Sequence, residues 1–318
     1  MRVLVTGGAG FIGSAVARAL VEQGDRVVVL DNFNHYYDPK LKEDRLRVLL
    51  AGHEVTVVRG DVTDSAAVAA LFDAHRFDAV CHLAAQAGVR ASLQAPQYST
   101  LVNVVGTANL LEAAHRAGVR RFVFASSSSV YGGNAKVPFA EADAVDHPVS
   151  VYAATKRAAE LLAETYHQLY GLRTVGLRYF TVYGPWGRPD MACFTFTRAI
   201  LDGQPIDVYN HGQMERDFTY IDDIVAGTVA ALHSNLAGEI INLGHHQPVT
   251  LDAFIGAIEA ATGKTAQRRL LPMQPGDVPR TYADISQAKA LLGWEPKTAL
   301  AEGIKKFVAW YQSYYQAP

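Results

Sequence analysis

The chain has 318 residues, enough for one large α/β domain with a smaller domain appended. Hydrophobic residues make up 49% and charged residues 19% of it, which excludes a disordered chain because a buried core is readily supplied. The formal net charge of -2 and the lack of a Lys/Arg run argue against a nucleic-acid partner.

Compartment and metal content follow from two further features. No apolar run approaches the ~20 residues of a membrane span, and a strand-like run starts directly after Met1, so we expect no signal peptide and no membrane association. The cysteines Cys81 and Cys193 lack metal or redox spacing, which fits a reducing compartment. We therefore expect a cytoplasmic protein without a bound metal.

Short apolar runs alternate with helical patterns along the first 178 residues. The predicted strands are 2–6, 26–30, 55–58, 79–84, 121–125 and 173–177. The predicted helices are 11–23, 64–75, 97–117 and 151–170. This βαβ alternation, with near-continuous apolar strands, predicts an α/β fold with a Rossmann-like, doubly wound parallel sheet covered by helices on both faces.

The pattern changes after about residue 178, where prolines and glycines separate shorter segments. Helices are predicted at 192–201, 221–233 and 251–261, and an apolar strand at 239–243. We expect this strand to return to the first sheet. The predicted division is a nucleotide-binding domain over 1–178, with the returning strand near 239–245, and a smaller, interleaved C-terminal domain that forms most of 179–318 and binds the substrate.

A glycine-rich turn, Gly7-x-x-Gly10-x-x-Gly13, joins the first strand to the first helix. Gly7 permits a tight turn, Gly10 lets a pyrophosphate approach the backbone, and Gly13 lets the helix pack on the strand. The helix N-terminus at Phe11 and Ile12 offers amide groups and a positive dipole end to phosphate. The motif has the strand before it and the helix after it that a dinucleotide site requires.

Acidic residues end the second and third predicted strands. Asp31 is placed to hold the adenosine ribose hydroxyls, and it repels a 2′-phosphate, so NAD is favoured over NADP. Asp61 and Val62 are candidates for the adenine. The alternative is an ordinary βα turn followed by a capping aspartate.

Tyr152 and Lys156 lie four residues apart on one face of a predicted helix. Lowering a tyrosine pKa from ~10 to ~7 takes about 4 kcal/mol, which one ammonium ~4 Å away supplies at an effective dielectric of ~20. Taken alone, a tyrosine and a lysine at this spacing usually lie on a solvent-exposed helix face and have no catalytic role. The serine run Ser126–Ser129 ends the fifth strand, however, where a hydroxyl can bind substrate while Tyr152 takes its proton.

These motifs, with Ser-Ser-Ser-Val-Tyr-Gly ending at Gly132, resemble those of the extended short-chain dehydrogenase/reductases along essentially the whole chain. Within that group the chain most resembles the UDP-glucuronate 4-epimerases. The strings that carry this resemblance are 31–38, 84–90, 178–191 and 216–223.

The resemblance implies a role for each matching position. Tyr152 would be the general base on the sugar 4-hydroxyl, Lys156 would bind the nicotinamide ribose and lower the Tyr152 pKa, and Ser127 would assist the proton transfer. Further implied NAD contacts are Asn32, Asn34, Leu83, Ala84, Ala85, Gln86, Asn103, Ser126 and Tyr179. Implied contacts to UDP are Val208, Tyr209, Arg216 and Arg280.

The implied mechanism is a closed redox cycle. C4 gives its hydride to NAD, the 4-keto sugar turns in the pocket, and the hydride returns to the opposite face. UDP-glucuronate would become UDP-galacturonate, and NAD would stay bound as a catalyst.

A substrate carboxylate needs donors, for which Ser128, Ser129 and Thr181 offer hydroxyls, and Arg90 and Arg188 offer cations. The position resembling Thr181 is asparagine in UDP-galactose 4-epimerases, which favours a different C6 group. Alternatively, Arg188 orders its loop or contacts the diphosphate, and Arg90 is structural or lies at a dimer face.

Three other functions stay open. The first is an epimerase for a neutral UDP-sugar. The second is a decarboxylase. Sequences of those enzymes resemble Ser-Glu-Val at the positions where this chain has Ser128-Ser129-Val130, so the acidic residue is absent here. The third is a non-catalytic NAD sensor, which would typically lose the Tyr-Lys pair. Helices 97–117 and 151–170 resemble those of a four-helix dimer interface, so a homodimer is expected.

Overall fold

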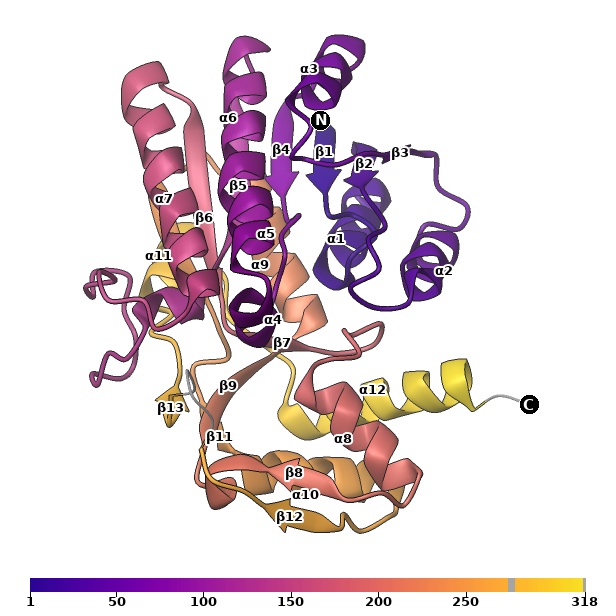
Figure 1. Cartoon of the computed structure of the whole chain (residues 1–318). Coiled ribbons are helices and arrows are strands. Elements are labelled where there is room, and N and C mark those ends of the chain that lie inside the picture. Colours follow the sequence, from indigo (N-terminus) through magenta and orange to yellow (C-terminus); the bar gives the residue numbers. More distant parts are fainter. Residues whose placement is uncertain (274–277, 317–318) are drawn as a thin grey trace.

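The computed structural model of the protein describes residues 1–273 and 278–316. Within these residues a seven-stranded sheet, parallel throughout, has the order β10-β6-β5-β4-β1-β2-β3 (Figure 1). Its strands are β1 (Arg2–Thr6), β2 (Arg26–Asp31), β3 (Val55–Arg59), β4 (Ala79–His82), β5 (Arg121–Ser127), β6 (Arg173–Tyr179) and β10 (Glu239–Leu243). The predicted Rossmann-like sheet is confirmed.

Helices cover both faces of this sheet. One layer contains α3 (Ser65–Ala74), α6 (Gly106–Arg116) and α7 (Val151–Tyr170), and the other contains α1 (Phe11–Glu22), α9 (Ile221–His233) and α11 (Ser286–Leu292). Alternate residues of β1 therefore enter different cores: Val3 and Val5 join one buried cluster, and Leu4 joins the other. Burial on both faces explains why the strand is apolar without alternation.

The smaller domain holds short strands and three helices among the described residues. β7 (Thr181–Tyr183) and β13 (Arg280–Thr281) run parallel to β9 (Glu215–Tyr220), and β11 (Pro248–Thr250) runs antiparallel to it. β8 (Ile206–Val208) pairs with β12 (Arg268–Leu270). The helices are α8 (Ala192–Leu201), α10 (Leu251–Thr262) and α12 (Leu300–Tyr315).

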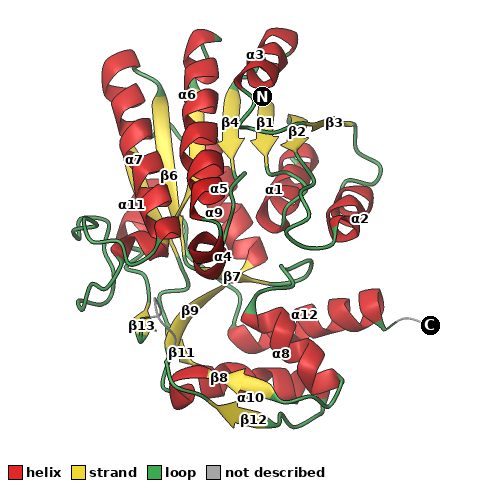
Figure 2. Ribbon diagram, in the orientation of Figure 1, coloured by secondary structure: helices red, strands yellow, loops and turns green. Residues whose placement is uncertain are grey.

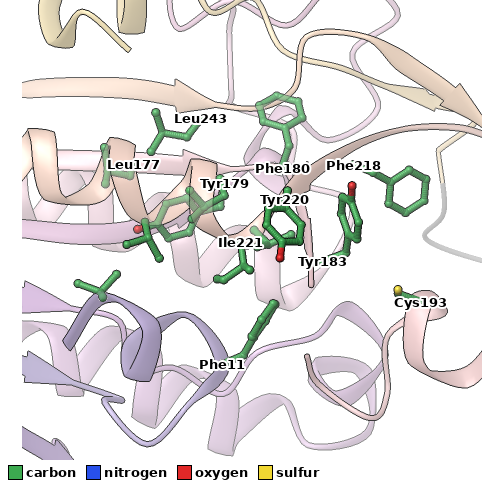
Figure 3. Close-up of a cluster of buried hydrophobic side chains, with 14 of the residues drawn as sticks. Phe11, Leu177, Tyr179, Phe180, Tyr183, Cys193, Phe218, Tyr220, Ile221 and Leu243 are labelled. Atoms are coloured by element: carbon green, nitrogen blue, oxygen red, sulfur yellow. The ribbon is translucent and has the colours of Figure 1, made fainter. Parts of the chain in front are cut away.

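The two parts share one core. Figure 3 shows Leu177, Tyr179 and Leu243 of the large sheet in the same cluster as Tyr183, Phe218 and Tyr220 of the smaller domain. The predicted return of the chain at 239–243 is confirmed, because β10 pairs with β6. The layer around α9 and α11 also belongs to the large sheet, so much of 221–292 supports the nucleotide-binding domain.

The predicted helix over 97–117 is present, since the backbone is helical from Pro96 to Arg116, but one of its turns is a π-helix. α4 (Val89–Gln94) and α5 (Pro96–Thr100) are followed by a π-helical segment, Leu101–Val105, before α6 begins. Within that segment the Asn103 side chain turns inward and accepts a hydrogen bond from the Gln86 amide (2.8 Å). A π-turn of this kind often marks a functional region. In the described part of the chain, no helix is long and apolar enough to cross a membrane.

Candidate active site

A cavity of about 900 Å³ opens where the carboxyl ends of the strands meet the smaller domain. In Figure 2 the arrowheads of β1, β4 and β6 point toward this junction. The cavity wall runs from the glycine turn, past the serines that end β5, to α8 and β9. Carboxyl ends of parallel strands are where such folds bind ligands.

The glycine turn is closely packed, as a phosphate-binding turn requires. Gly7 has φ +66°, and a Cβ there would lie 2.7 Å from the Ala84 amide nitrogen. A Cβ on Gly13 would lie 2.1 Å from the Gly7 carbonyl oxygen. Gly10 caps α1 without a side-chain hydrogen bond, and the first residues of the helix line the cavity. This cradle fits a dinucleotide pyrophosphate.

The ribose end of the cavity carries charges of both signs. Asp31 accepts hydrogen bonds from the amides of Ala9 (3.1 Å) and Phe33 (2.8 Å). Beside it Lys42, on α2 (Pro39–Leu49), donates to the Asn34 backbone oxygen (2.9 Å) and side-chain oxygen (2.7 Å). Burial lowers the pKa of Lys42, and the Asp31 carboxylate opposes that effect. Asp31 and Lys42 together suit the adenosine ribose hydroxyls, because a hydroxyl both donates and accepts hydrogen bonds.

Helix α7 brings the Tyr-Lys pair to the serines. Ser150 caps the helix by accepting from the Ala153 amide (3.1 Å), which sets Tyr152 in its first turn. Lys156, one turn later, is buried and its Nζ donates to the Ala125 carbonyl oxygen of β5 (2.9 Å). Both side chains line the cavity together with Ser127. The predicted proximity of these groups is present in the structure.

The surroundings of Tyr152 change its pKa in both directions. Burial raises the pKa of Tyr152, while the Arg188 guanidinium and a hydrogen bond with Ser127 lower it. Lys156, predicted to be the main opposing cation, lies with Nζ 5.9 Å from the Tyr152 ring centroid and points to Ala125. Arg188 therefore adds a second cation to the cavity wall that holds Tyr152 and Lys156.

Lys156 is itself tuned by its surroundings. Burial lowers its pKa to about 8, and the Glu160 carboxylate one helical turn away opposes this. Glu160 accepts from the Ser126 hydroxyl (2.6 Å) and from Arg178 Nε (2.8 Å). One buried carboxylate thus supports both the end of the serine strand and the ammonium.

A family model described as the NAD dependent epimerase/dehydratase family matches residues 3–244. The chain belongs to this family. UDP-glucuronate 4-epimerase 1 of Arabidopsis thaliana is 50% identical over 331 residues, covering 98% of this chain and 77% of that protein. The predicted resemblance to extended short-chain dehydrogenase/reductases of the epimerase type is confirmed.

Solved structures of epimerases share the whole fold. UDP-glucuronic acid 4-epimerase from Bacillus cereus, in complex with UDP-glucuronic acid and NAD, matches with a TM-score of 0.93 and 36% identity, covering 99% of this chain and 100% of that one. UDP-glucose 4-epimerase from Thermotoga maritima, with UDP-glucose, matches with a TM-score of 0.91 and 33% identity, covering 98% and 99%.

Most residues predicted for the site of this epimerase-family protein line the one cavity. Those toward the cofactor end are Gly7, Gly10, Phe11, Ile12, Gly13, Asp31, Asn32, Asn34, Val62, Leu83, Ala84, Ala85, Gln86, Ser126, Lys156 and Tyr179. Those toward the substrate end are Arg90, Ser127, Ser128, Ser129, Tyr152, Thr181, Arg188, Tyr209 and Arg216.

Two residues predicted to contact the cofactor lie outside the cavity wall, each for a visible reason. Asp61 accepts from Asn32 Nδ2 (2.8 Å) and from the Thr63 amide (2.9 Å), so it supports Asn32. The Asn103 side chain accepts a hydrogen bond from the Gln86 amide and donates to the Gln86 carbonyl oxygen and to Thr155 Oγ1 (3.0 Å). Both act on the site through neighbours.

Two residues predicted to contact UDP also lie outside the wall. Val208 is completely buried in the core of the smaller domain. Arg280 pairs with Glu215 at the strand edge. Arg216, the other predicted diphosphate ligand, does line the cavity, and its Nη1 donates to the Glu215 carbonyl oxygen (2.9 Å).

Several wall residues were not predicted. Tyr36 and Asp190 lie within the strings 31–38 and 178–191 that carry the family resemblance, so a signal was present in the sequence. Lys42 had a weaker signal, since α2 is polar and its start is marked only by Asp38-Pro39. Thr195 and Arg198 of α8 had none, because only tertiary packing turns them toward the cavity.

Proposed function

We propose that this protein interconverts UDP-glucuronate and UDP-galacturonate by epimerisation at C4, with NAD as a bound catalyst. The observation that carries the proposal is a single cavity that joins the glycine turn, the Tyr152–Ser127 pair and the β9 wall with Arg216. The names of its relatives support the same reaction.

We also place the protein in the cytoplasm, which its free cysteines Cys81 and Cys193 favour.

The residues of the chain divide the chemistry among them. Tyr152 accepts the O4 proton as the sugar is oxidised to the 4-keto form, and returns it on reduction. The Ser127 hydroxyl lowers the pKa of Tyr152, lines the same cavity and assists that transfer. Lys156 holds a positive charge at the end of β5. The glycine turn and Asp31 would hold NAD, which would supply the acceptor and donor for the C4 hydride.

The wall around the sugar end suits an acidic C6 group. Ser128, Ser129 and Thr181 present hydroxyls to the cavity, and Arg90 and Arg188 present guanidinium groups. A carboxylate buried among neutral groups alone would be strongly destabilised, so these cations favour glucuronate over glucose. The Arg90 guanidinium also lies 5.3 Å from the ring centroid of Tyr209, a residue predicted to contact UDP.

Proton NMR of the purified protein with UDP-glucuronate, without added NAD, tests this function. We expect UDP-galacturonate to accumulate, because the cofactor is regenerated in each cycle and stays bound. Formation of UDP-xylose or a 4-keto pentose would instead identify a decarboxylase. Turnover of UDP-glucose with none of UDP-glucuronate would identify an epimerase of neutral sugars.

We further propose that the protein is a homodimer, formed by the helical face of the α5 to α7 layer. Apolar side chains are exposed there, among them Leu101 (44%), Val105 (42%) and Leu161 (53%). The segment that carries Leu101 and Val105 packs against α7, which carries Leu161, and a second copy of the chain would cover these apolar side chains.

Size-exclusion chromatography with light scattering tests the dimer. We expect a mass of twice the 34.5 kDa chain, and a shift to the single-chain mass for Leu161→Asp. Leu270→Asp, at a similarly exposed position (56%) on β12, serves as the matched control and should stay dimeric. A wild-type protein that elutes as a monomer would refute the proposal.

A further inference from the structure

The first turn of α7 leaves Tyr152 with a backbone amide that the helix cannot satisfy. The first four N–H groups of an α-helix have no acceptor within it, and α7 begins at Val151, so the Tyr152 amide is one of them. Ser150 serves the two amides that follow, because its hydroxyl accepts from Ala153 (3.1 Å) and its carbonyl oxygen accepts from Ala154 (3.0 Å). The Tyr152 amide therefore needs an acceptor from outside the helix.

Ser92 of α4 supplies that acceptor. The Tyr152 amide donates to Ser92 Oγ (3.0 Å), a contact between residues 60 positions apart in the sequence. The Ser92 hydroxyl donates its own hydrogen to the Val89 carbonyl oxygen (2.7 Å), which leaves the oxygen lone pairs to accept from Tyr152. Ser92 is 0% exposed, so bulk water cannot replace this contact.

The segment that carries Ser92 is also part of the cavity wall. Residues 88–91 line the cavity directly before Ser92, and α4 packs against α7. Gly88 precedes α4 with φ +112°, and its carbonyl oxygen accepts from the Ser92 amide (3.1 Å). One buried hydroxyl thus joins this wall, through the Val89 carbonyl, to the backbone of Tyr152.

The carbonyl group of Tyr152 is held by a different side chain. Thr155 Oγ1 donates to the Tyr152 carbonyl oxygen (2.8 Å) and accepts from Asn103 Nδ2 (3.0 Å). This carbonyl also belongs to the hydrogen-bond ladder of the helix. The amide lies outside that ladder and depends on Ser92, so the loss of the Ser92 hydroxyl would free the amide side of Tyr152 alone.

Resting on the proposed function, we propose that Ser92 is a positioning residue for the epimerisation, whose hydroxyl fixes the backbone of Tyr152 against the 88–91 wall so that the phenol meets O4 of the sugar. Ser92 is not among the residues of the cavity wall, so it acts through Tyr152 and takes no part in proton transfer. A general base works only within hydrogen-bond reach of its proton, and a misplacement of ~1 Å can cost about 10²-fold in rate.

Ser92→Ala tests this role, because it leaves the Tyr152 amide buried without its acceptor. We expect kcat of the holoenzyme, expressed per bound NAD and measured by proton NMR, to fall about 10- to 100-fold. KM for UDP-glucuronate should stay within about threefold of the wild-type value, since Ser92 does not line the cavity. A folded Ser92→Ala protein with the wild-type kcat would overturn the proposal.

Ser99→Ala is the matched control. Ser99 lies on α5, which also packs against α7, and it is 0% exposed like Ser92. Its hydroxyl, however, has no hydrogen-bond partner among the described residues. Ser99→Ala should therefore leave kcat unchanged. An equal loss in both variants would mean that kcat responds to packing beneath α7 rather than to the Ser92 hydrogen bond, which would also overturn the proposal.

The double variant with Tyr152→Phe separates positioning from a general weakening of the fold. If Ser92 acts by placing the Tyr152 hydroxyl, its effect should disappear once that hydroxyl is gone. Ser92→Ala should then lower the residual kcat of Tyr152→Phe by less than about twofold, because the two residues act as a unit. The same fold-loss of kcat in both backgrounds would show a merely structural role and would contradict the proposal.

Amide hydrogen exchange followed by NMR, with isotope-labelled tyrosines, reports the contact itself without turnover. The Tyr152 amide should exchange at least about tenfold faster in Ser92→Ala than in the wild type, and at the wild-type rate in Ser99→Ala. Unchanged exchange in Ser92→Ala would refute the contact. A wild-type protein that forms no UDP-galacturonate would refute the proposed function, whereas an active wild type with an unimpaired Ser92→Ala variant would refute this role alone.

Discussion

Replacing Tyr152 by phenylalanine is expected to lower kcat of epimerisation by about 10²- to 10⁴-fold, the usual contribution of a positioned general base. The substitution removes only the hydroxyl. The ring keeps its place, because the backbone amide of Tyr152 still donates to Ser92 Oγ (3.0 Å) and the Ser150 cap of α7 is unaffected. Binding of UDP-glucuronate, measured by titration calorimetry, should change by less than about tenfold, since one neutral hydrogen bond is worth about 1 kcal/mol.

Tyr166→Phe is the matched control for this prediction. Tyr166 lies on the same helix, and its hydroxyl donates to Glu112 (2.9 Å) outside the cavity wall. Its loss should leave kcat unchanged. A Tyr152→Phe protein that keeps a substantial part of the wild-type rate by NMR would show that another group takes the O4 proton.

The order of strands and helices could be predicted because each part of it is local. The run Val3 to Val5 is apolar at every position since both faces of β1 are covered, and the glycine turn that follows needs Gly7 at positive φ. The start of α7 at Val151 was predictable from the Ser150 cap and the periodic pattern after it. Such features specify structure within about one or two turns of chain.

The electrostatics of the site could not be predicted, because they depend on where distant segments meet. Arg45 looks like one basic residue of a polar helix, yet it is fully buried against Ala9 and the 186–187 backbone. Lys156 is the nearest cation to Tyr152 in sequence, but the distant Arg188 also lines the cavity, and its charge opposes the rise that burial causes in the Tyr152 pKa. Spacing along a helix indicates which side chains share a face and leaves open where a long side chain points.

The buried ion pair behind the site shows the same dependence on tertiary structure. Glu160 and Arg178 have side chains 1% and 2% exposed, and Arg178 Nε and Nη2 donate to the two carboxylate oxygens at 2.8 and 2.9 Å. Burial raises the pKa of Glu160, but Arg178 and Ser126 hold it below its ordinary value. The stabilisation from this charge is therefore present above about pH 4.5 and is lost as the pH falls through the lower folded-state pKa.

Glu160→Leu should lower the free energy of unfolding by about 3–5 kcal/mol, because it leaves Arg178 buried without its carboxylate. Arg157→Ala, which removes the partly exposed partner of the same glutamate (29% exposed), should lower the free energy of unfolding by at most about 1 kcal/mol. Urea denaturation at neutral pH measures both. Adding Arg178→Met to Glu160→Leu should recover part of the loss, since a buried pair replaced on both sides is often nearly neutral. A Glu160→Leu protein as stable as the wild type would mean that Arg178 finds another partner, and that this pair does not support the end of β5.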